Sequence, residues 1–370
     1  MQIIEYPVEI RLSYPLDRLG EPSGLLFFDI ETTGFSAFSS ALYLIGAVYL
    51  KDGVFMLRQW FSESLSDELP LLRSFFDFAL QFKTLVHFNG EGFDLRYLAD
   101  TASQYGIRSP LSELASFDIL KQLRKCRSLL ELSSMRQKSI ERFLRIDRED
   151  RYSGGELIAV YEAFLKSGDE ELKKLLLLHN AEDLSGMPGI LPALLYRDAL
   201  LKPPEPESAG KENGAYVLTF RYNDAFPVPL KHACGKALLS FCDDRMTLSV
   251  PLYAGTLRYY YPDFKNYYYL PHEDMAIHKK LAQFVEKPYR VQATPETCYT
   301  RMEGLFVPAA KESGLPVFHR ELKDNEAYHR IPEDPAFPGI YGAALLREFL
   351  NEKSPHPNGR RIGQDRSYHE

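Results

Sequence analysis

Two acidic residues, separated by one residue, end an apolar run in this sequence. In FFDIETTGF, residues 27–35, Asp29 and Glu31 flank Ile30. Strand side chains alternate between two faces, so both carboxylates would emerge on one face and Ile30 on the other. Like charges held together cost free energy unless a cation or a proton lies between them, so the pair is a candidate site for a hard divalent ion. The alternative is a solvated strand end whose acids face water.

A third acid lies in HFNGEGFDLRYL, residues 87–98, where a short apolar run gives way to a turn. Asp94 stands at the start of an expected helix, and Asn89 lies in the turn before it as a candidate substrate contact. The structural alternative for Asp94 is a helix cap or a first-turn acid.

A fourth acid lies in LLHNAEDL, residues 177–184, where His179 and Asp183 are four residues apart. On the helix expected here, that spacing places both side chains on one face. A surface His–Asp pair is the alternative.

Together these residues suit a hydrolytic metal site. Ligands of open α/β sheets bind at the carboxyl ends of strands, where each acid is expected to lie. Four carboxylates and one histidine are what two-metal phosphodiester hydrolysis requires, with ions about 4 Å apart holding the attacking water and the leaving oxygen. Carboxylates favour Mg²⁺ or Mn²⁺, and an imidazole suits a general base near neutral pH. The predicted catalytic residues are Asp29, Glu31, Asp94, Asp183 and His179.

Periodicity indicates the elements that would position them. Apolar runs separated by the turn KDG predict a hairpin, and later segments alternate between helical and strand patterns. This order predicts an α/β fold with a mixed sheet covered by helices. Expected strands are 24–30, 41–50, 53–61, 84–90 and 115–120, and expected helical regions are 66–82, 93–106 and 169–201.

Composition divides the chain, whose 370 residues suffice for two domains. KPPEPESAGKENG lacks apolar periodicity and resembles a linker. Beyond it lie four strand-like runs and one expected helix at 272–286. The predicted order is an N-terminal extension at 1–19, the α/β domain at 20–201, the linker at 202–214, a β-rich (α+β) domain at 215–350 and a disordered tail at 351–370.

Hydrophobic residues make up 45% and charged residues 26%, as in soluble globular proteins. The sequence shows neither a membrane span nor a secretory signal, so we expect a cytoplasmic protein with no membrane partner. The four scattered cysteines disfavour a zinc site or a disulfide framework.

The net charge of −7 argues against a protein that coats nucleic acid with its whole surface. Between residues 121 and 151, however, ten Lys or Arg stand against five Asp or Glu. Such a run suits a phosphate backbone, or else a solvated helix face with ion pairs such as Glu141 with Arg145.

The motifs FDIETTG, FNGEGFD and HNAED, spread in this order from about residue 27 to residue 183, resemble the three exonuclease motifs of the DEDD superfamily, which has a ribonuclease-H-like fold. More closely, LYLIGAVYL, FNGEGFDLRYL, SIERFLRIDREDRYSGGELI and HNAEDLSGM resemble the YprB-like branch of predicted nucleases. The resemblance covers roughly residues 20–200.

The resemblance implies that the four acids bind two Mg²⁺ or Mn²⁺ ions, with Asp29 bridging both, and that His179 is the general base. Thr32 or the adjacent backbone would contact the 3′-terminal nucleotide. In one respect this sequence differs: histidine-type members usually place five residues from His to the last Asp, whereas here the spacing from His179 to Asp183 is four, as in tyrosine-type members. This spacing leaves exonuclease polarity open.

Further residues are candidates for substrate contacts. FLRIDREDRYSGGELI combines a Gly-Gly turn with the basic residues Arg145, Arg148 and Arg151, which would close over a backbone strand or else pair with neighbouring acids. The tyrosines at 259–261 and 267–269 would stack on unpaired bases or form ordinary strands with one buried face.

The sequence therefore predicts a metal-dependent nuclease, and the resemblance implies a 3′-to-5′ exonuclease on single-stranded DNA or RNA. The alternatives are a nucleic-acid-binding scaffold with an inactive nuclease-like domain, and an endonuclease or hydrolase of short nucleotides. All five catalytic positions are filled, which favours an enzyme over a scaffold.

Overall fold

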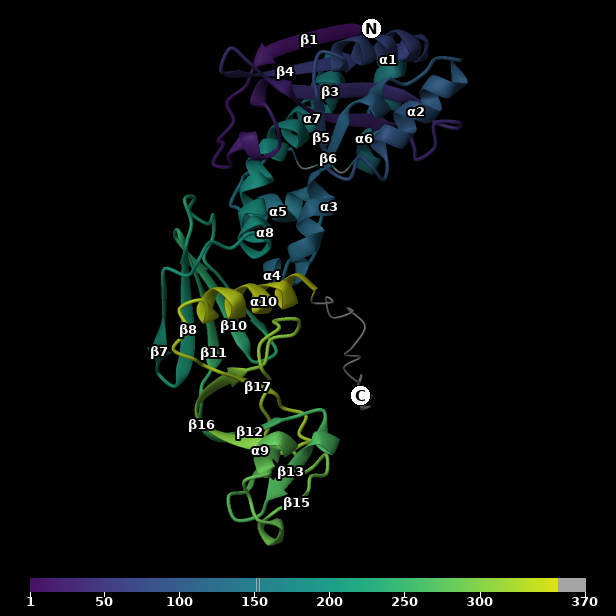
Figure 1. Ribbon diagram of the computed structural model, residues 1–370. Coiled ribbons are helices and arrows are strands. Elements are labelled where there is room, and N and C mark those ends of the chain that lie inside the picture. The colour runs from purple at the N-terminus through teal and green to yellow at the C-terminus, as the bar shows by residue number, and fades with distance from the viewer. Residues whose placement is uncertain (151, 153, 352–370) are drawn as a thin grey trace, which may run out of the picture. The chain divides into compact units, whose positions relative to one another are not determined.

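A computed structural model describes residues 1–150, 152 and 154–351 (Figure 1). The chain forms two compact units, of which the first comprises Met1–Arg127, Glu131–Asp198 and Phe226–Val228. The second comprises residues 128–130, 199–225 and the described residues from 229 onward. Arg151 and the tail from residue 352 lie outside the described residues. Among the described helices, none combines the length and the apolar character needed to cross a membrane.

The first unit is built on a six-stranded mixed sheet with the order β1-β4-β3-β2-β5-β6. Neighbours from β1 to β2 are antiparallel, whereas β5 is parallel to β2 and β6 is parallel to β5. The expected extension at 1–19 thus supplies an edge strand, because β1 pairs with β4 along its length. The strands are β1 (Gln2–Pro7), β2 (Leu25–Thr32), β3 (Leu42–Lys51), β4 (Val54–Phe61), β5 (Thr84–His87) and β6 (Ala115–Asp118).

Long helices cover both faces of this sheet, which confirms the predicted α/β class. Ile30 of β2 packs with Phe75 and Leu98 in one core, and Phe61 of β4 packs with Tyr161 in the other. Burying a large apolar side chain contributes about 1.5–3 kcal/mol, so these cores fix both layers on the sheet. The first core holds α1 (Glu68–Ala79) and α2 (Asp94–Gln104), and the second holds α6 (Gly154–Ser167) and α7 (Glu170–Ile190).

Shorter helical segments connect these elements. They are η1 (Leu16–Arg18), η2 (Pro22–Gly24), η3 (Leu65–Asp67), η4 (Leu111–Glu113), α3 (Ile119–Leu123), η5 (Arg124–Cys126), α4 (Arg127–Leu130), α5 (Gln137–Phe143), η6 (Leu191–Ala193) and α8 (Leu194–Leu201).

The second unit contains three antiparallel sheets, which confirms its predicted β-rich character. Their orders are β7-β8-β11-β10-β9, β12-β16-β17 and β14-β13-β15. The strands are β7 (Ser208–Glu212), β8 (Ala215–Arg221), β9 (Leu230–Cys234), β10 (Ala237–Cys242), β11 (Arg245–Pro251), β12 (Tyr253–Tyr260), β13 (Tyr267–Leu270), β14 (Met275–His278), β15 (Val291–Gln292), β16 (Tyr299–Pro308) and β17 (Tyr328–Arg330). The helical segments are η7 (Phe264–Asn266), α9 (Lys279–Ala282), η8 (Lys287–Tyr289) and α10 (Phe337–Asn351).

Two-residue turns explain both the hairpin that the sequence predicts and a strand that it does not predict. The expected hairpin of β3 and β4 closes through Asp52 and Gly53, both with positive φ. Asn213 and Gly214 form an equivalent turn between β7 and β8, so β7 lies inside the stretch expected to be a linker. Asn-Gly is a strong hairpin signal, and the charged, Pro-rich surroundings concealed it.

The helix expected over 272–286 is also different in the structure. Met275–His278 forms β14, which pairs with the tyrosines of β13, and only the four residues of α9 are helical. Cross-strand pairing outweighs the helical pattern here, because local propensity is worth only a few tenths of a kcal/mol per residue.

Candidate active site

Asp29 and Glu31 lie where β2 extends beyond its parallel neighbour. β5 pairs with β2 only up to Phe27, so both acids stand past the end of β5. Their cross-strand partners on β3 are Gly46 and Leu44, and Leu44 belongs to the core beneath α6 and α7. The two carboxylates therefore face α7, and Ile30 faces the opposite core, as the alternation predicts.

Asp94 is the first residue of α2 and reaches the same region of β2. Its Oδ1 accepts a hydrogen bond from the Ile30 N–H at 3.3 Å, and its side chain is buried. Asp94 is thus bonded to β2, rather than only capping its own helix.

The loop before α2 is held by β6. Asp118 accepts hydrogen bonds from the N–H groups of Asn89 at 3.1 Å and Glu91 at 3.4 Å. His87 Nδ1 accepts from the Gly90 N–H at 3.0 Å, and burial lowers the pKa of His87, which favours the neutral ring that can accept. A side chain at Gly90 would lie 2.6 Å from that ring, so the loop requires glycine there.

His179 and Asp183 enter the cluster from α7. His179 Nε2 lies 3.6 Å from Glu31 Oε1 and 3.4 Å from Asp183 Oδ2. Ligand atoms of these three residues all lie within 4.8 Å of one another. The structure thus brings together all five residues that the sequence nominates.

An amide pair that the sequence analysis missed seats α7 on the sheet. Asn180 donates to Asp29 Oδ2 at 3.2 Å and accepts from Gln59 Nε2 at 3.0 Å. Gln59 also donates to the Leu177 carbonyl at 2.9 Å, so β4 and β2 both bind the helix. Gly46 makes room for this contact, and an isolated glycine in an apolar strand was the available signal.

Replacing Gly46 with alanine is expected to lower the free energy of unfolding by about 1–3 kcal/mol, the usual cost of overpacking. The new Cβ would lie 2.0 Å from Asn180 Oδ1 and 2.3 Å from Leu184 Cδ1. Denaturant titration measures the loss. Gly155→Ala is the matched control, because a Cβ there meets nothing within 4 Å. Equal stability of both variants would show that α7 is not seated this closely.

Negative charge in the cluster is strongly disfavoured without a cation. Burial first, and then the charge of Asp94, raises the pKa of Asp29 well above its ordinary value. Burial and the charge of Asp183 likewise raise the pKa of Glu31. Burial raises the pKa of Asp94 from 3.8 to about 7. Oxygen donors whose mutual repulsion a cation would relieve fit hard divalent ions such as Mg²⁺ or Mn²⁺.

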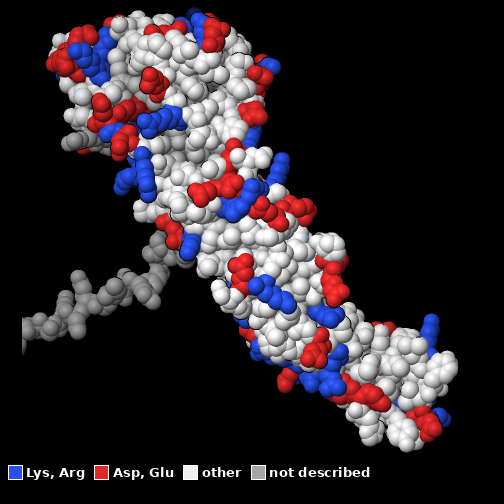
Figure 2. Space-filling view, turned by 90° about the vertical axis from the view of Figure 1, so that its left-hand side faces the viewer, with Lys and Arg blue, Asp and Glu red and all other residues white. Residues whose placement is uncertain are grey.

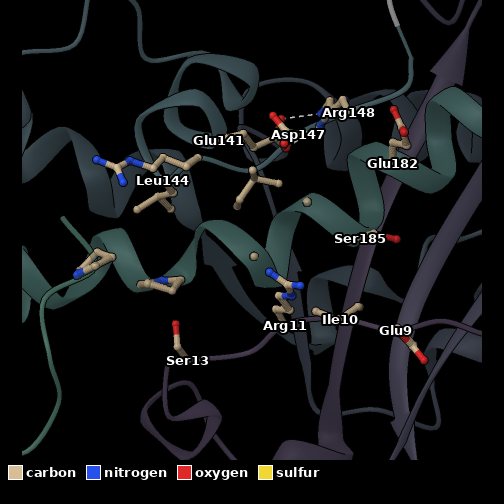
Figure 3. A pocket seen from close by; sticks show the side chains of 16 residues that line it. Glu9, Ile10, Arg11, Ser13, Glu141, Leu144, Asp147, Arg148, Glu182 and Ser185 are labelled. Atoms are coloured by element: carbon tan, nitrogen blue, oxygen red, sulfur yellow. Dashed lines mark hydrogen bonds and ion pairs between the residues drawn. The ribbon is translucent and has the colours of Figure 1, made fainter.

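The remaining candidate contacts differ in position: Thr32 and Asn89 are close in sequence to the acids of β2 and α2, whereas the cavity that Arg145 lines includes none of the five cluster residues. The Thr32 hydroxyl donates to the Gly34 carbonyl at 2.7 Å, and Asn89 has a left-handed backbone in the loop before α2. Arg145, also left-handed, is exposed and lines a cavity of about 690 Å³ between the N-terminal segment and α7 (Figure 3). Arg148 lines the cavity too, but its guanidinium is bound by Glu141 and Asp183.

Three of the described basic residues between positions 121 and 151 form ion pairs with acids. Lys121 pairs with Glu91 at 2.6 Å, and Lys138 pairs with Asp150 at 2.9 Å. Glu141 pairs with Arg148, not with Arg145 as the helical spacing suggests. On the face shown in Figure 2, basic and acidic residues alternate without forming a continuous basic track.

Two further residues beside the site escaped the sequence analysis. Asp150 Oδ2 lies 2.7 Å from His179 Nδ1, and its side chain is only 2% exposed. Phe35, in the loop after β2, is 95% exposed and touches Phe93, the residue before Asp94, edge to face. An aromatic residue directly after TTG was the visible signal for Phe35, whereas Asp150 gave none.

Comparisons with known proteins bear on the first unit. Residues 26–194 match the family model described as the RNase_H superfamily. No curated protein matches the sequence. Similar solved structures include the family B DNA polymerase from the hyperthermophilic archaeon Pyrobaculum calidifontis, which is 15% identical in sequence. The match covers 88% of this chain and 45% of that chain with a TM-score of 0.40.

Two exonuclease I structures are also similar. The apo form is 13% identical in sequence, and the match covers 55% of this chain and 58% of that chain with a TM-score of 0.31. The zinc-bound E. coli ExoI–ssDNA complex is 12% identical in sequence, and the match covers 54% of this chain and 55% of that chain with a TM-score of 0.28. The chain spans about half the length of these solved proteins. The family match, together with a mixed sheet flanked by helices, shows that the first unit has a ribonuclease-H-like fold.

Proposed function

We propose that this protein is a metal-dependent nuclease that hydrolyses phosphodiester bonds, acting as a 3′-to-5′ exonuclease on single-stranded ends. One observation carries the proposal: four carboxylates and one imidazole, from β2, α2 and α7, converge on one site in which burial and repulsion disfavour negative charge. The match to the RNase_H superfamily model supports a nuclease. The motif resemblance to DEDD and YprB-like nucleases supports the finer assignment.

Each residue has a role in this proposal. Asp29, Glu31, Asp94 and Asp183 would hold two Mg²⁺ or Mn²⁺ ions. Ions bound there would polarise the attacked phosphate and the water. His179 presents Nε2 to the space beside Glu31 and Asp183, where it takes the proton of the attacking water. General-base catalysis of this kind is typically worth about 10²–10⁴ in rate.

The substrate contacts follow from position and exposure. We propose that Thr32 and Asn89 contact the terminal nucleotide and that Arg145 contacts the backbone. Arg151 is proposed for the same backbone contact, although its position is not described. An Arg148 contact with phosphate would require its two ion pairs to break, so a different role is proposed for it below.

Phe35→Ala is expected to raise KM for a single-stranded oligonucleotide by about 5- to 150-fold, because stacking a base on an aromatic side chain is worth roughly 1–3 kcal/mol. A phenylalanine exposed to 95% beside the acid cluster is placed for such stacking. Phe38→Ala, in the same loop and 72% exposed, is the comparison variant. An unchanged KM in Phe35→Ala would remove the stacking role.

The alternatives predict different products. A 5′-labelled single strand of DNA or RNA, digested with Mn²⁺, gives a ladder shortened from the 3′ end if the protein is the proposed exonuclease. Internal cuts would instead identify an endonuclease. If the labelled strands stay intact but are retained on a filter, and Mn²⁺ gives no rise in melting temperature, the scaffold alternative holds.

A further inference from the structure

We propose that residues Arg148–Asp150, here named the clasp, position the two catalytic side chains of α7. Arg148 fixes the Asp183 carboxylate, and Asp150 fixes the His179 ring. The inference rests on the proposed function, because it assigns a task to residues around that same site. The clasp lies in the loop after α5, and both of these contacts are made to residues of α7.

Arg148 binds two carboxylates at once. Its Nε lies 2.5 Å from Glu141 Oε2 and its Nη2 lies 2.6 Å from Glu141 Oε1, and Nη1 donates to Asp183 Oδ1. The side chain is only 9% exposed, and that of Glu141 is only 2% exposed. A bidentate arginine pair has a defined geometry, so Asp183 Oδ1 is held by a rigid donor. Its other oxygen, Oδ2, remains beside His179 and available to a metal.

Asp150 acts on the histidine in the same manner. The Asp150 carboxylate accepts from Lys138 Nζ at 2.9 Å through Oδ2 and from the Tyr152 N–H at 3.0 Å through Oδ1, so it is an acceptor. His179 Nδ1, 2.7 Å away, must then carry the proton that it donates. In the neutral ring, Nε2 is left with its lone pair directed to the space beside Glu31 and Asp183. This is the tautomer that a general base requires.

The clasp is itself held against α7. Glu182 accepts from the N–H groups of Glu149 and Asp150, both at 2.8 Å. Gly186 allows the close approach, since a Cβ there would lie 2.2 Å from Glu141 Oε1. Figure 3 shows Arg148 joined to Glu141, with Glu182 on the adjacent helix. Residues 179, 182, 183 and 186 lie on neighbouring turns, so one loop is bonded along one side of α7.

The first experiment tests Arg148 through metal binding. Arg148→Gln alone would leave Glu141 buried and unpaired, so the informative variant is Glu141→Gln/Arg148→Gln, which keeps the pair neutral overall. Titration calorimetry with Mn²⁺ is expected to show affinity about 10- to 100-fold weaker than wild type, the usual effect of losing an outer-shell partner. Arg142→Gln, on the exposed side of α5, is the control. Wild-type affinity in the double variant would overturn the role of Arg148.

The second experiment tests Asp150 by spectroscopy and kinetics. Asp150→Ala, which removes the acceptor, is expected to lower kcat about 10- to 100-fold with little change in KM or in Mn²⁺ affinity, because it disturbs the base and not the carboxylates. ¹⁵N NMR of the His179 ring, assigned by His179→Gln, should show the Nδ1–H tautomer in wild type and its loss in Asp150→Ala. Asp147→Ala, exposed in the same loop, is the control. An unchanged tautomer would overturn the role of Asp150.

Failure of the clasp and failure of the proposed function give different results. If wild type binds Mn²⁺ but cleaves no strand, the nuclease proposal fails, while the Mn²⁺ affinity of the double variant still decides the role of Arg148. If wild type binds no Mn²⁺, both the metal site and the Arg148 role fail. The His179 tautomer depends on neither cleavage nor metal, so it decides the role of Asp150 in every case.

Discussion

Asp29→Asn is expected to make the metal-free protein more stable while it abolishes metal-dependent cleavage. Burial and the neighbouring acids Asp94 and Glu31 raise the pKa of Asp29 well above its ordinary value, so ionised Asp29 destabilises the fold. Asparagine keeps an oxygen that accepts the Asn180 N–H, at 3.2 Å in the wild type, and removes the charge. Because asparagine cannot ionise, we expect Asp29→Asn to unfold at a higher denaturant concentration than wild type at neutral to mildly basic pH.

Cleavage should fall at the same time, because a proposed metal ligand is lost. We expect a decrease of more than about 10²-fold, the scale of removing one preorganised electrostatic group. Denaturant unfolding in EDTA measures stability, and the melting-temperature rise with Mn²⁺ should disappear. Asp77→Asn, an exposed carboxylate on α1, controls for charge alone. A less stable Asp29→Asn that still gains stability from Mn²⁺ would contradict the metal site.

The metal-free protein should lose stability as pH rises from about 4 to about 7, the range between the ordinary pKa of Asp94 and its raised value. Within this range Asp94 is protonated in the folded state and ionised in the unfolded state. Unfolding then releases protons, so the free energy of unfolding falls with increasing pH. For Asp94 alone the loss amounts to roughly 4 kcal/mol, and the raised pKa values of Asp29 and Glu31 act in the same direction.

Divalent cations should reverse this slope, because they bind the ionised carboxylates. Melting temperatures in EDTA are expected to fall across the range, and those in saturating Mn²⁺ to rise. Asp94→Asn should reduce the decline in EDTA, because its side chain no longer titrates. Parallel curves with and without Mn²⁺ would mean that the carboxylates are not linked to a metal.

Much of the site could be predicted from the sequence, because strand alternation and helical spacing determine where its side chains point. The alternation in Asp29-Ile30-Glu31 and the helical spacing of His179 and Asp183 determine side-chain direction within one element. The mixed sheet likewise follows from the order of apolar runs. The roles of the five residues remain predictions, to be decided by the experiments above.

The contacts that hold these elements together could not be predicted from the sequence. Asp150 reaches His179 across 29 residues of sequence, and Asn180 reaches Asp29 across 151. Such pairs depend on tertiary packing, which a periodic pattern does not specify. Arg148 illustrates the point: its charge suggested a phosphate contact, whereas the fold places its guanidinium, with the side chain 9% exposed, between two acids.

Cleavage of a 5′-labelled single strand by wild type, Asp183→Asn and His179→Gln, each with Mn²⁺ and with EDTA, tests the central claim most directly. The account predicts metal-dependent shortening by wild type, and losses of about 10²-fold or more in both variants, because one lacks a ligand and the other lacks the base. Equal shortening by all three proteins, or shortening that persists in EDTA, would contradict it.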